Sequence, residues 1–261
     1  MLLDDRVVIV SGIGPGLGQE LALAAARENA AGIVLAARTE SYLKDVEAAV
    51  NDQYPSRTLV VPTDIAQRKQ CQRLVEATIS EFGRIDALIN SAYTPGKFGL
   101  FEDADLESWR VPMEVNLFGS LGLTQAVVPH MKRAGGGAIV FVNTMVHKKP
   151  LETQGAYASS KGALTAASKI LAKELGPHGI RVNSVYMGWM WGPPVESYVQ
   201  AVAHEQGVSQ EEIVAGITQA IPLGAIPDDA DCANAAIFLA SDYARVITGA
   251  SLDVNGGEWM P

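Results

Sequence analysis

Short apolar runs recur along the chain and alternate with longer segments in which charged residues interrupt apolar ones. The runs are rich in valine and isoleucine and cover residues 7–11, 33–37, 58–62, 87–90, 138–143, 181–185 and 251–254. Strands of this kind are buried on both faces, as in a parallel sheet. The intervening segments are long enough for right-handed crossover helices. The pattern predicts a single α/β domain over residues 1–261, with a Rossmann-like, doubly wound, seven-stranded parallel sheet flanked by helices.

The regular alternation breaks between residues 187 and 227, directly after the sixth predicted strand. This stretch carries several prolines and glycines together with Trp189 and Trp191. Ligands of open α/β sheets bind at the carboxyl ends of the strands, and long loops beside such sites often exclude water when they close. We therefore expect residues 187–227 to form a mobile lid over the substrate. A rigid, pre-packed wall is the alternative.

The first predicted strand leads into a glycine-rich turn and then into an alanine-rich helix. The turn reads Gly12-Ile13-Gly14-Pro15-Gly16-Leu17-Gly18, and the helix is predicted over residues 19–28. Glycine lets the backbone approach a ligand, and the free N–H groups and positive end of a helix attract phosphate. A strand, a glycine turn and a helix in this order predict nucleotide binding, with a plain tight turn as the alternative.

Tyr157 and Lys161 lie four residues apart in an alanine-rich segment that favours a helix, so their side chains share one helix face. A phenol has a pKa near 10, and a cation within about 4–6 Å lowers that pKa. Such a phenol can donate and accept protons near neutral pH. Thr144, at the end of the fifth predicted strand, adds a hydroxyl group. Taken alone, the Tyr-x-x-x-Lys spacing is also typical of an exposed helix face.

Composition narrows the range of functions. The chain has 261 residues, 48% of them hydrophobic and 19% charged, which is enough for one substantial core. Its net charge of −9 argues against general binding to nucleic acid or to anionic membranes. Cys71 and Cys232 have no histidines at a metal-ligand spacing, which favours buried thiols over a zinc site or a disulfide. With no recognisable signal peptide or membrane span, we expect a cytoplasmic protein without a metal.

These motifs together resemble the short-chain dehydrogenase/reductase family in its single-domain branch. Further landmarks of the family occur in the same order and include Asp64-Ile65, Asn90-Ser91-Ala92, Asn116, Gly188 and the segment Asn255-Gly256-Gly257. The resemblance covers nearly the whole chain. It implies an NAD(P)-dependent oxidoreductase that interconverts a secondary alcohol and a ketone by hydride transfer.

The resemblance also implies roles for individual residues. Tyr157 would be the general acid and base, Lys161 would lower its pKa and bind the nicotinamide ribose, and Thr144 would orient the substrate oxygen. Asn116 would hold a water molecule for proton relay, or would brace two segments of backbone. The family usually has serine at the position of Thr144. The expected cofactor-binding residues are Gly12, Gly14, Gly16, Leu17, Gly18, Arg38, Asp64, Ile65, Asn90, Ala92, Tyr157, Lys161 and Gly188.

The choice between NAD and NADP depends on the end of the second predicted strand. An acidic side chain there would bind the ribose hydroxyls of NAD, but Ala37 holds the position and Arg38 follows it. A guanidinium group suits a phosphate, so we expect NADP. A solvated Arg38 is the alternative. Asp64 would contact the adenine amine, although an aspartate after a strand is also a good helix cap.

The chain departs from the family pattern around the expected substrate. Tyr93 stands where the family has a glycine near the cofactor, and Gly192 stands where a threonine often binds the carboxamide. The expected substrate residues are Tyr93, Val146, Met187, Trp189 and Trp191. Apolar and aromatic side chains of this kind favour a hydrophobic or cyclic, steroid-like alcohol or ketone.

Two other functions remain as alternatives. One is a nucleotide-binding sensor or scaffold without turnover. The other is enoyl reduction, which the three-residue gap between Tyr157 and Lys161 disfavours because that branch of the family spaces the pair more widely. We expect a homotetramer or homodimer built on paired helices, with residues 103–133 and the helix of Tyr157 as candidates.

Overall fold

The computed structural model describes residues 1–261 and contains one seven-stranded sheet whose strands are all parallel. The strands are β1 (Val7–Ser11), β2 (Gly32–Ala37), β3 (Arg57–Pro62), β4 (Ala87–Asn90), β5 (Gly137–Thr144), β6 (Ile180–Met187) and β7 (Ser251–Val254). Their spatial order is β3-β2-β1-β4-β5-β6-β7. The doubly wound, Rossmann-like sheet predicted from the apolar runs is therefore confirmed.

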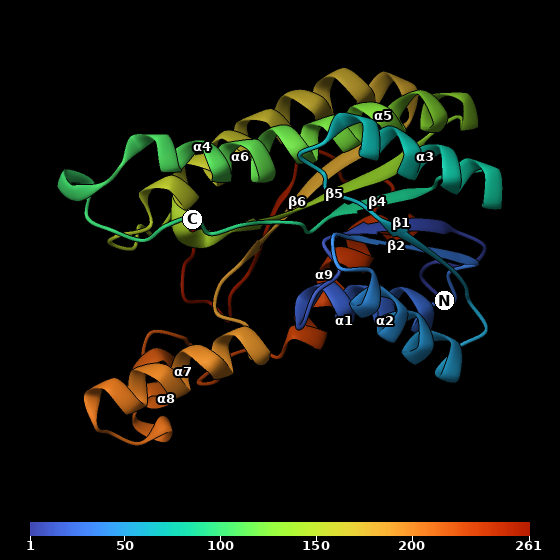
Figure 1. The fold of residues 1–261 in the computed structure, drawn as a ribbon. Helices are drawn as coiled ribbons and strands as arrows, with labels where there is room; N and C mark the ends of the chain where they lie inside the picture. The colour runs from blue at the N-terminus through green and yellow to red at the C-terminus, as the bar shows by residue number, and fades with distance from the viewer.

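Helices cover both faces of the sheet (Figure 1). One layer consists of α1 (Leu17–Arg27), α2 (Glu40–Gln53) and α9 (Asp229–Ala240), and the other of α3 (Arg68–Phe82), α5 (Ser120–Ala134) and α6 (Gly155–Leu175). Within β1, Val8 and Val10 pack into the core beside α1, whereas Ile9 packs into the core on the opposite face. Both faces of the strand are thus buried, which explains the continuous apolar run in the sequence. None of the helices combines the length and apolar character needed to cross a membrane.

The strands end along one edge of the sheet, where the chain changes direction. β1 pairs with β2 on one side and with β4 on the other, so the loops that follow β1 and β4 lead to opposite sides. Thr144 at the end of β5 is in register with Met187 at the end of β6. Ligands of doubly wound sheets bind at such a switch point. The glycine turn after β1 lies at this edge.

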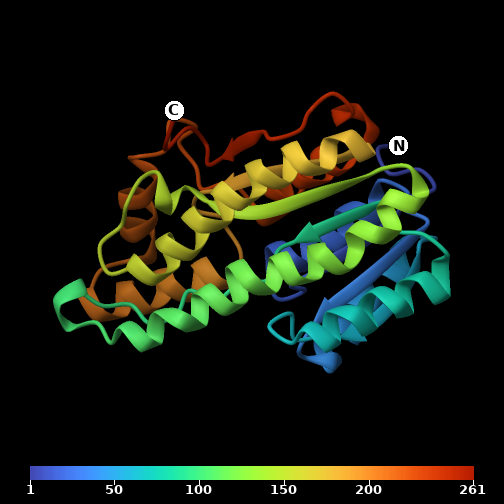
Figure 2. The ribbon, with the colours of Figure 1, turned by 90° about the horizontal axis from the view of Figure 1, so that it is seen from above.

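A long helical segment crosses the second layer, as Figure 2 shows from above. It consists of α4 (Arg110–Pro112), a π-helical stretch (Met113–Gly119) and α5, without a break between them. The predicted helix over 103–133 therefore begins a few residues later than expected. Asn116 lies within the π-helical stretch. Such widened turns in α-helices frequently occur at functional sites.

Residues 187–227 differ from the expected irregular loop, because they contain two helices. α7 (Pro193–Gln206) and α8 (Gln210–Thr218) pack on each other and project from the body as a hairpin (Figure 1). The prolines at the start of α7 occupy positions where a helix needs no N–H donor. Ser209 and Glu212 form a reciprocal capping box at the start of α8. The prolines begin a helix here, whereas the sequence prediction treated the prolines and glycines of this region as loop signals.

Candidate active site

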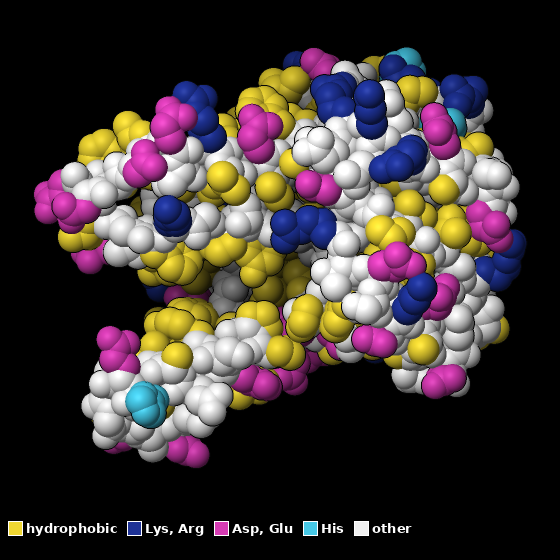
Figure 3. Space-filling view, in the orientation of Figure 1, with side chains coloured by type: hydrophobic (Ala, Val, Ile, Leu, Met, Phe, Trp, Pro, Cys, Tyr) yellow, Lys and Arg dark blue, Asp and Glu magenta, His cyan; other side chains and the backbone are white.

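A cavity of about 780 Å³ lies at the carboxyl edge of the sheet, between the body and the α7–α8 hairpin. Figure 3 shows a deep hollow at this place with many hydrophobic side chains on its walls. Most of the predicted site residues line it: Gly12, Gly14, Leu17, Gly18, Arg38, Asp64, Ile65, Ala92, Tyr93, Thr144, Val146, Tyr157, Lys161, Met187, Gly188 and Trp189. These predicted residues therefore gather around one cavity, and the volume of the cavity suits a bound small molecule.

The glycine turn after β1 is held in close contact with the loop after β4. A Cβ atom on Gly12, whose φ is +95°, would lie only 2.2 Å from the Ala92 nitrogen. A Cβ on Gly18 would lie 2.2 Å from the Gly12 carbonyl oxygen. The first N–H groups of α1, those of Leu17 and Gly18, have no acceptor within the chain. Free N–H groups at a helix start beside a cavity fit a phosphate group.

Arg38 follows β2 and lines the same cavity with an exposed side chain. It makes no ion pair, and the neighbouring Glu40 carboxylate is engaged with Lys44 at 2.7 Å. The guanidinium group is therefore free to meet an anionic ligand. The Asp64 carboxylate accepts a hydrogen bond from the Ala66 N–H at 3.0 Å and also lines the cavity. This contact is a local turn ahead of α3, whose N-cap residue is Gln67, so Asp64 does not cap that helix. These residues fit a nicotinamide dinucleotide.

Tyr157 and Lys161 lie on α6 and reach the cavity together. Lys161 is 2% exposed, and its Nζ donates a hydrogen bond to the carbonyl oxygen of Val142 at 2.7 Å. Tyr157 keeps part of its surface open to the cavity. Its ring faces that of Tyr93, with centroids 6.0 Å apart and planes inclined at 52°. The predicted pair therefore shares one face of a helix, as the four-residue spacing requires.

The electrostatics of this pair differ from the expectation. Burial lowers the pKa of Lys161 to about 7, so its side chain is only partly charged at neutral pH. Burial also raises the pKa of Tyr157 above its usual value, and Tyr93 adds to the rise, whereas the nearby Thr144 hydroxyl lowers it as a hydrogen-bond partner. The expected lowering by Lys161 is absent because desolvation acts on both groups. Tyr157 consequently keeps its proton at neutral pH in the ligand-free protein.

Thr144 ends β5 and is 6% exposed. Its hydroxyl donates to the Met187 carbonyl oxygen at 3.4 Å and accepts from the Val146 N–H at 3.3 Å. Thr144 thus makes the local backbone contacts that the sequence left open as an alternative, although the side chain also lines the cavity. Both hydrogen bonds are long, so the hydroxyl can turn toward a ligand at small energetic cost.

The loop after Thr144 is fastened by the C-terminal part of the chain. Lys148 forms an ion pair with Asp253 at 2.8 Å, with both side chains largely buried. Its ammonium group also lies over the rings of Tyr186 and Trp259, at 4.1 and 4.5 Å from their centroids. Pairs of this kind gain strength when they are desolvated. They fix the direction in which the chain leaves β5.

Asn116 braces the site from behind and does not line the cavity. Its side-chain oxygen accepts from the Thr94 N–H at 2.8 Å, and its Nδ2 donates to the Thr94 carbonyl oxygen and the Ser160 hydroxyl, each at 2.9 Å. Ser160 in turn donates to the carbonyl oxygen of Tyr157 at 2.8 Å. Asn90 is 2% exposed and likewise lies outside the cavity lining. Bracing of two backbone segments, the second expectation for Asn116, is therefore observed.

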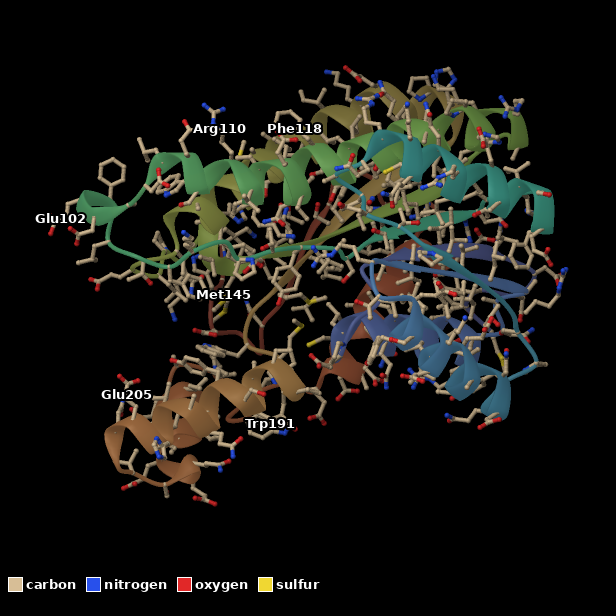
Figure 4. The ribbon with its side chains drawn as sticks, in the orientation of Figure 1. Glu102, Arg110, Phe118, Met145, Trp191 and Glu205 are labelled. Carbon is tan, nitrogen blue, oxygen red and sulfur yellow. The ribbon has the colours of Figure 1, made fainter.

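The two tryptophans of the expected substrate wall lie in different places. Trp189 lines the cavity and packs on Tyr198 of α7, with ring centroids 5.4 Å apart. Trp191 is absent from the lining, and Figure 4 shows it beneath α7, on the side away from Met145. Its backbone N–H donates to the Pro227 carbonyl oxygen at 2.7 Å, which fixes this orientation. Trp191 is therefore not part of the cavity wall, contrary to the expectation.

Asp229 is the residue that the sequence analysis missed. It is 6% exposed and lines the cavity at the start of α9. A Cβ atom on Gly192 would lie 1.8 Å from its Oδ2 atom, so the glycine in place of the threonine expected there leaves room for this carboxylate. An aspartate after Pro227 looks like an ordinary helix cap in the sequence. Only the folded arrangement places it beside the glycine turn.

Comparisons with known proteins agree with this geometry. A family model described as enoyl-(acyl carrier protein) reductase matches residues 12–258. The chain is 33% identical over 257 residues to a D-threitol dehydrogenase of Mycolicibacterium smegmatis, a match that covers 98% of this chain and 93% of the relative. Its fold is similar to that of the L-sorbose reductase of Gluconobacter frateurii in complex with NADPH and L-sorbose. That structure has a TM-score of 0.93 and 28% identity, covering 99% of this chain and 98% of the other.

A 7α-hydroxysteroid dehydrogenase, solved with NADH and 7-oxo glycochenodeoxycholic acid, is also similar. It has a TM-score of 0.88 and 29% identity, covering 98% of this chain and 95% of the other. The named substrates and cofactors of these proteins differ, whereas the fold and the oxidoreductase chemistry are shared. The chain therefore belongs to the short-chain dehydrogenase/reductase family and is an NAD(P)-dependent oxidoreductase that acts on CH–OH and C=O groups.

Proposed function

We propose that this protein interconverts a secondary alcohol and a ketone, with Tyr157 as the general acid and base and NADP as the cofactor. The observation that carries the proposal is that Tyr157, Lys161 and Thr144 line one cavity together with the free N–H groups that begin α1. The nicotinamide, when bound, supplies or accepts the hydride at the carbinol carbon. The side chains of the protein then have to bind, orient and exchange a proton.

Tyr157 supplies the proton in the direction of reduction. The phenol is protonated at neutral pH, so it can donate a proton to a carbonyl oxygen that becomes negatively charged. The Thr144 hydroxyl, turned away from Met187, would donate to the same oxygen and hold it in place. Lys161 has a pKa of about 7, which suits a group that returns a proton to the phenol at neutral pH. Asn116 keeps Tyr157 in position through Ser160.

The preference for NADP is based on Arg38. Its guanidinium group lines the cavity at the end of β2 and has no carboxylate partner, and the adjacent Ala37 leaves no acid to bind the ribose hydroxyls of NAD. Arginine binds a phosphate through two parallel charge-assisted hydrogen bonds. The similar proteins named above include one solved with NADPH and one with NADH, so Arg38 supports the choice and the family does not.

The cavity favours a hydrophobic or cyclic, steroid-like substrate. Apolar side chains from several elements line the cavity together with Tyr157, namely Phe98, Val111, Val115, Met145, Val146, Leu151 and Trp189. A polyol in such surroundings would leave hydroxyl groups without partners, which costs about 1–3 kcal/mol for each group. A flat apolar ring would instead gain from burial. The α7–α8 hairpin, which carries Tyr198 against Trp189, is our proposed mobile cover for the substrate.

Two apolar side chains on the outer helices support an assembly of identical subunits. Phe118, at the end of the π-helical stretch, is 53% exposed, and Ile170 on α6 is 59% exposed. Large apolar side chains exposed on neighbouring helices mark interaction surfaces when they gather. We propose a homodimer or homotetramer through this face. Sedimentation equilibrium of an Ile170→Glu variant tests it, and an unchanged mass would exclude this face as the interface.

A single-turnover experiment tests the proposed function. The protein is mixed with NADPH and one ketone at a time, and the absorbance of the reduced nicotinamide is followed for cyclic apolar ketones, open-chain apolar ketones and ketose sugars. We expect oxidation of NADPH with the cyclic apolar ketones above all. Cofactor binding without any oxidation across the panel would point to a sensor without turnover. Faster oxidation with the ketose sugars would overturn the substrate class alone.

A further inference from the structure

Asp229 is a buried carboxylate at the point where three helices begin. It is the first residue of α9, while Gly16 and Gly192 are the cap residues of α1 and α7. Both glycines touch the Asp229 side chain, because a Cβ atom on Gly16 or on Gly192 would lie 2.5 or 1.8 Å from its Oδ2 atom. The start of a helix carries a partial positive charge. The Asp229 carboxylate therefore occupies a place that is suited to an anion.

No cation and no hydrogen-bond donor within the chain engages this carboxylate. The groups that face it are acidic or neutral and come from each element packed around it: Glu20 on α1, Glu196 on α7, Asp228 and Cys232 beside it, and Tyr93 after β4. Burial raises the pKa of Asp229 to about 6, and the neighbouring carboxylates add to the rise. The helix starts act in the opposite direction, because they favour the charged form.

The same corner of the cavity is the proposed seat of the cofactor's pyrophosphate. The N–H groups of Leu17 and Gly18 have no acceptor within the chain, and both residues line the cavity with Asp229. A pyrophosphate binds to N–H groups of this kind at the start of the first helix of such a sheet. An ionised Asp229 beside the cap of that helix would repel the pyrophosphate in a low-dielectric setting.

We propose that the Asp229 carboxylate competes with the cofactor's pyrophosphate for the start of α1, so that the dinucleotide binds tightly only when Asp229 is protonated or replaced by a neutral side chain. The inference rests on the cofactor site of the proposed function. Each binding event then takes up a proton. The affinity for the cofactor falls as the pH rises through the range in which free Asp229 ionises, by up to about tenfold for each pH unit.

The first test compares Asp229→Asn, which keeps the shape and removes the charge, with Asp231→Asn, an exposed carboxylate on the same helix. The dissociation constant for NADP is measured between about pH 5.5 and 8.5. We expect Asp229→Asn to bind roughly tenfold tighter than wild type at the alkaline end and equally well at the acidic end. Asp231→Asn should follow wild type. The cofactor's 2′-phosphate itself titrates near pH 6 and changes the affinity of both proteins. The quantity to compare is therefore the ratio of the two dissociation constants at each pH.

The second test counts protons directly. Calorimetry of NADP binding in two buffers of different ionisation enthalpy gives the proton uptake, which we expect to be larger for wild type than for Asp229→Asn near pH 7.5. Equal uptake with equal affinity would overturn the inference while leaving the cofactor site intact. Weaker binding by Asp229→Asn would also overturn it, because the carboxylate would then support the three helix starts. Absence of NADP binding by wild type at every pH would instead refute the proposed function.

Discussion

The ammonium group of Lys161 donates to the carbonyl oxygen of Val142 at 2.7 Å, so α6 is tied to β5. Val142 belongs to β5, two residues before Thr144, and Lys161 is one helical turn after Tyr157. The contact places a buried lysine in a setting that disfavours its charge, and burial lowers its pKa to about 7. The fold thus keeps a buried lysine that lowers the free energy of unfolding of the ligand-free protein.

Replacing Lys161 with methionine should stabilise the protein and remove its activity. The fall of the Lys161 pKa from 10.5 to about 7 corresponds to roughly 5 kcal/mol at most, less about 1–3 kcal/mol for the lost hydrogen bond. Between pH 7 and 10.5 the unfolded chain binds more protons at Lys161 than the folded one. The free energy of unfolding of wild type therefore increases as the pH rises through this range. Urea unfolding at about pH 7 and 9 measures the free energy of unfolding of both proteins. We expect the variant to exceed wild type by more at about pH 7 than at about pH 9. A destabilised variant at both pH values would contradict the argument.

Tyr157→Phe should lose nearly all turnover while its affinity for NADP stays within about twofold of wild type. The hydroxyl transfers a proton, but the nucleotide does not need it for binding. Steady-state kinetics with the best ketone and fluorescence titration with NADPH measure the two effects. Tyr93→Phe is the matched control, since it removes a phenol hydroxyl from the same cavity. A kcat close to that of wild type in Tyr157→Phe would remove Tyr157 from the mechanism.

Arg38→Asp should weaken the binding of NADP by roughly 2 kcal/mol or more, and the binding of NAD far less. The change removes a charge-assisted hydrogen bond to the 2′-phosphate and adds repulsion. Dissociation constants for both cofactors decide the matter, and Arg73→Asp serves as a control because Arg73 is an exposed arginine outside the cavity. If both cofactors weaken equally in Arg38→Asp, the guanidinium group does not recognise the phosphate.

Trp189→Ala should raise KM for bulky apolar ketones more than for small ones, whereas Trp191→Ala should leave both nearly unchanged. Trp189 lines the cavity and Trp191 does not, so the lost contact area affects only the first variant. Steady-state kinetics with a cyclic and a three-carbon ketone provide the comparison. An effect of Trp191→Ala as large as that of Trp189→Ala would place both indoles against the substrate.

The sheet could be predicted from sequence because its five inner strands, β2, β1, β4, β5 and β6, are buried along nearly their whole length and read as apolar runs. The edge strands β3 and β7 are only partly buried. Val8 and Ile9 face opposite cores, so no polar position interrupts β1. The secondary structure of residues 187–227 was harder to predict, because proline and glycine occur both in loops and at helix ends. Pro193 begins α7, and the Ser209–Glu212 capping box begins α8. Pro193 and Ser209 can be recognised as helix starts only once the segments that follow them are assigned as helices.

The site was predictable where chemistry is local in the sequence and unpredictable where it depends on packing. Tyr157 and Lys161 are separated by one helical turn, so their spacing predicts a shared helix face. The spacing points to a functional pair only together with the glycine turn and the other family landmarks. The direction of the Tyr157 pKa was predicted wrongly, because burial is a property of the whole fold. Asp229 was missed for the same reason, since its neighbours Gly16 and Gly192 are distant in sequence.

The ion pair between Lys148 and Asp253 has a consequence for the order in which the protein matures during synthesis. Lys148 leaves the ribosome long before Asp253, which belongs to the last strand, β7. Until β7 joins β6, the loop after Thr144 lacks this ion pair. We therefore expect the proposed proton-transfer centre to form only after β7 has joined the sheet. Nascent chains stalled before residue 250 should therefore bind NADPH through the early glycine turn and yet fail to oxidise it. Turnover by such chains would show that the fastening is dispensable.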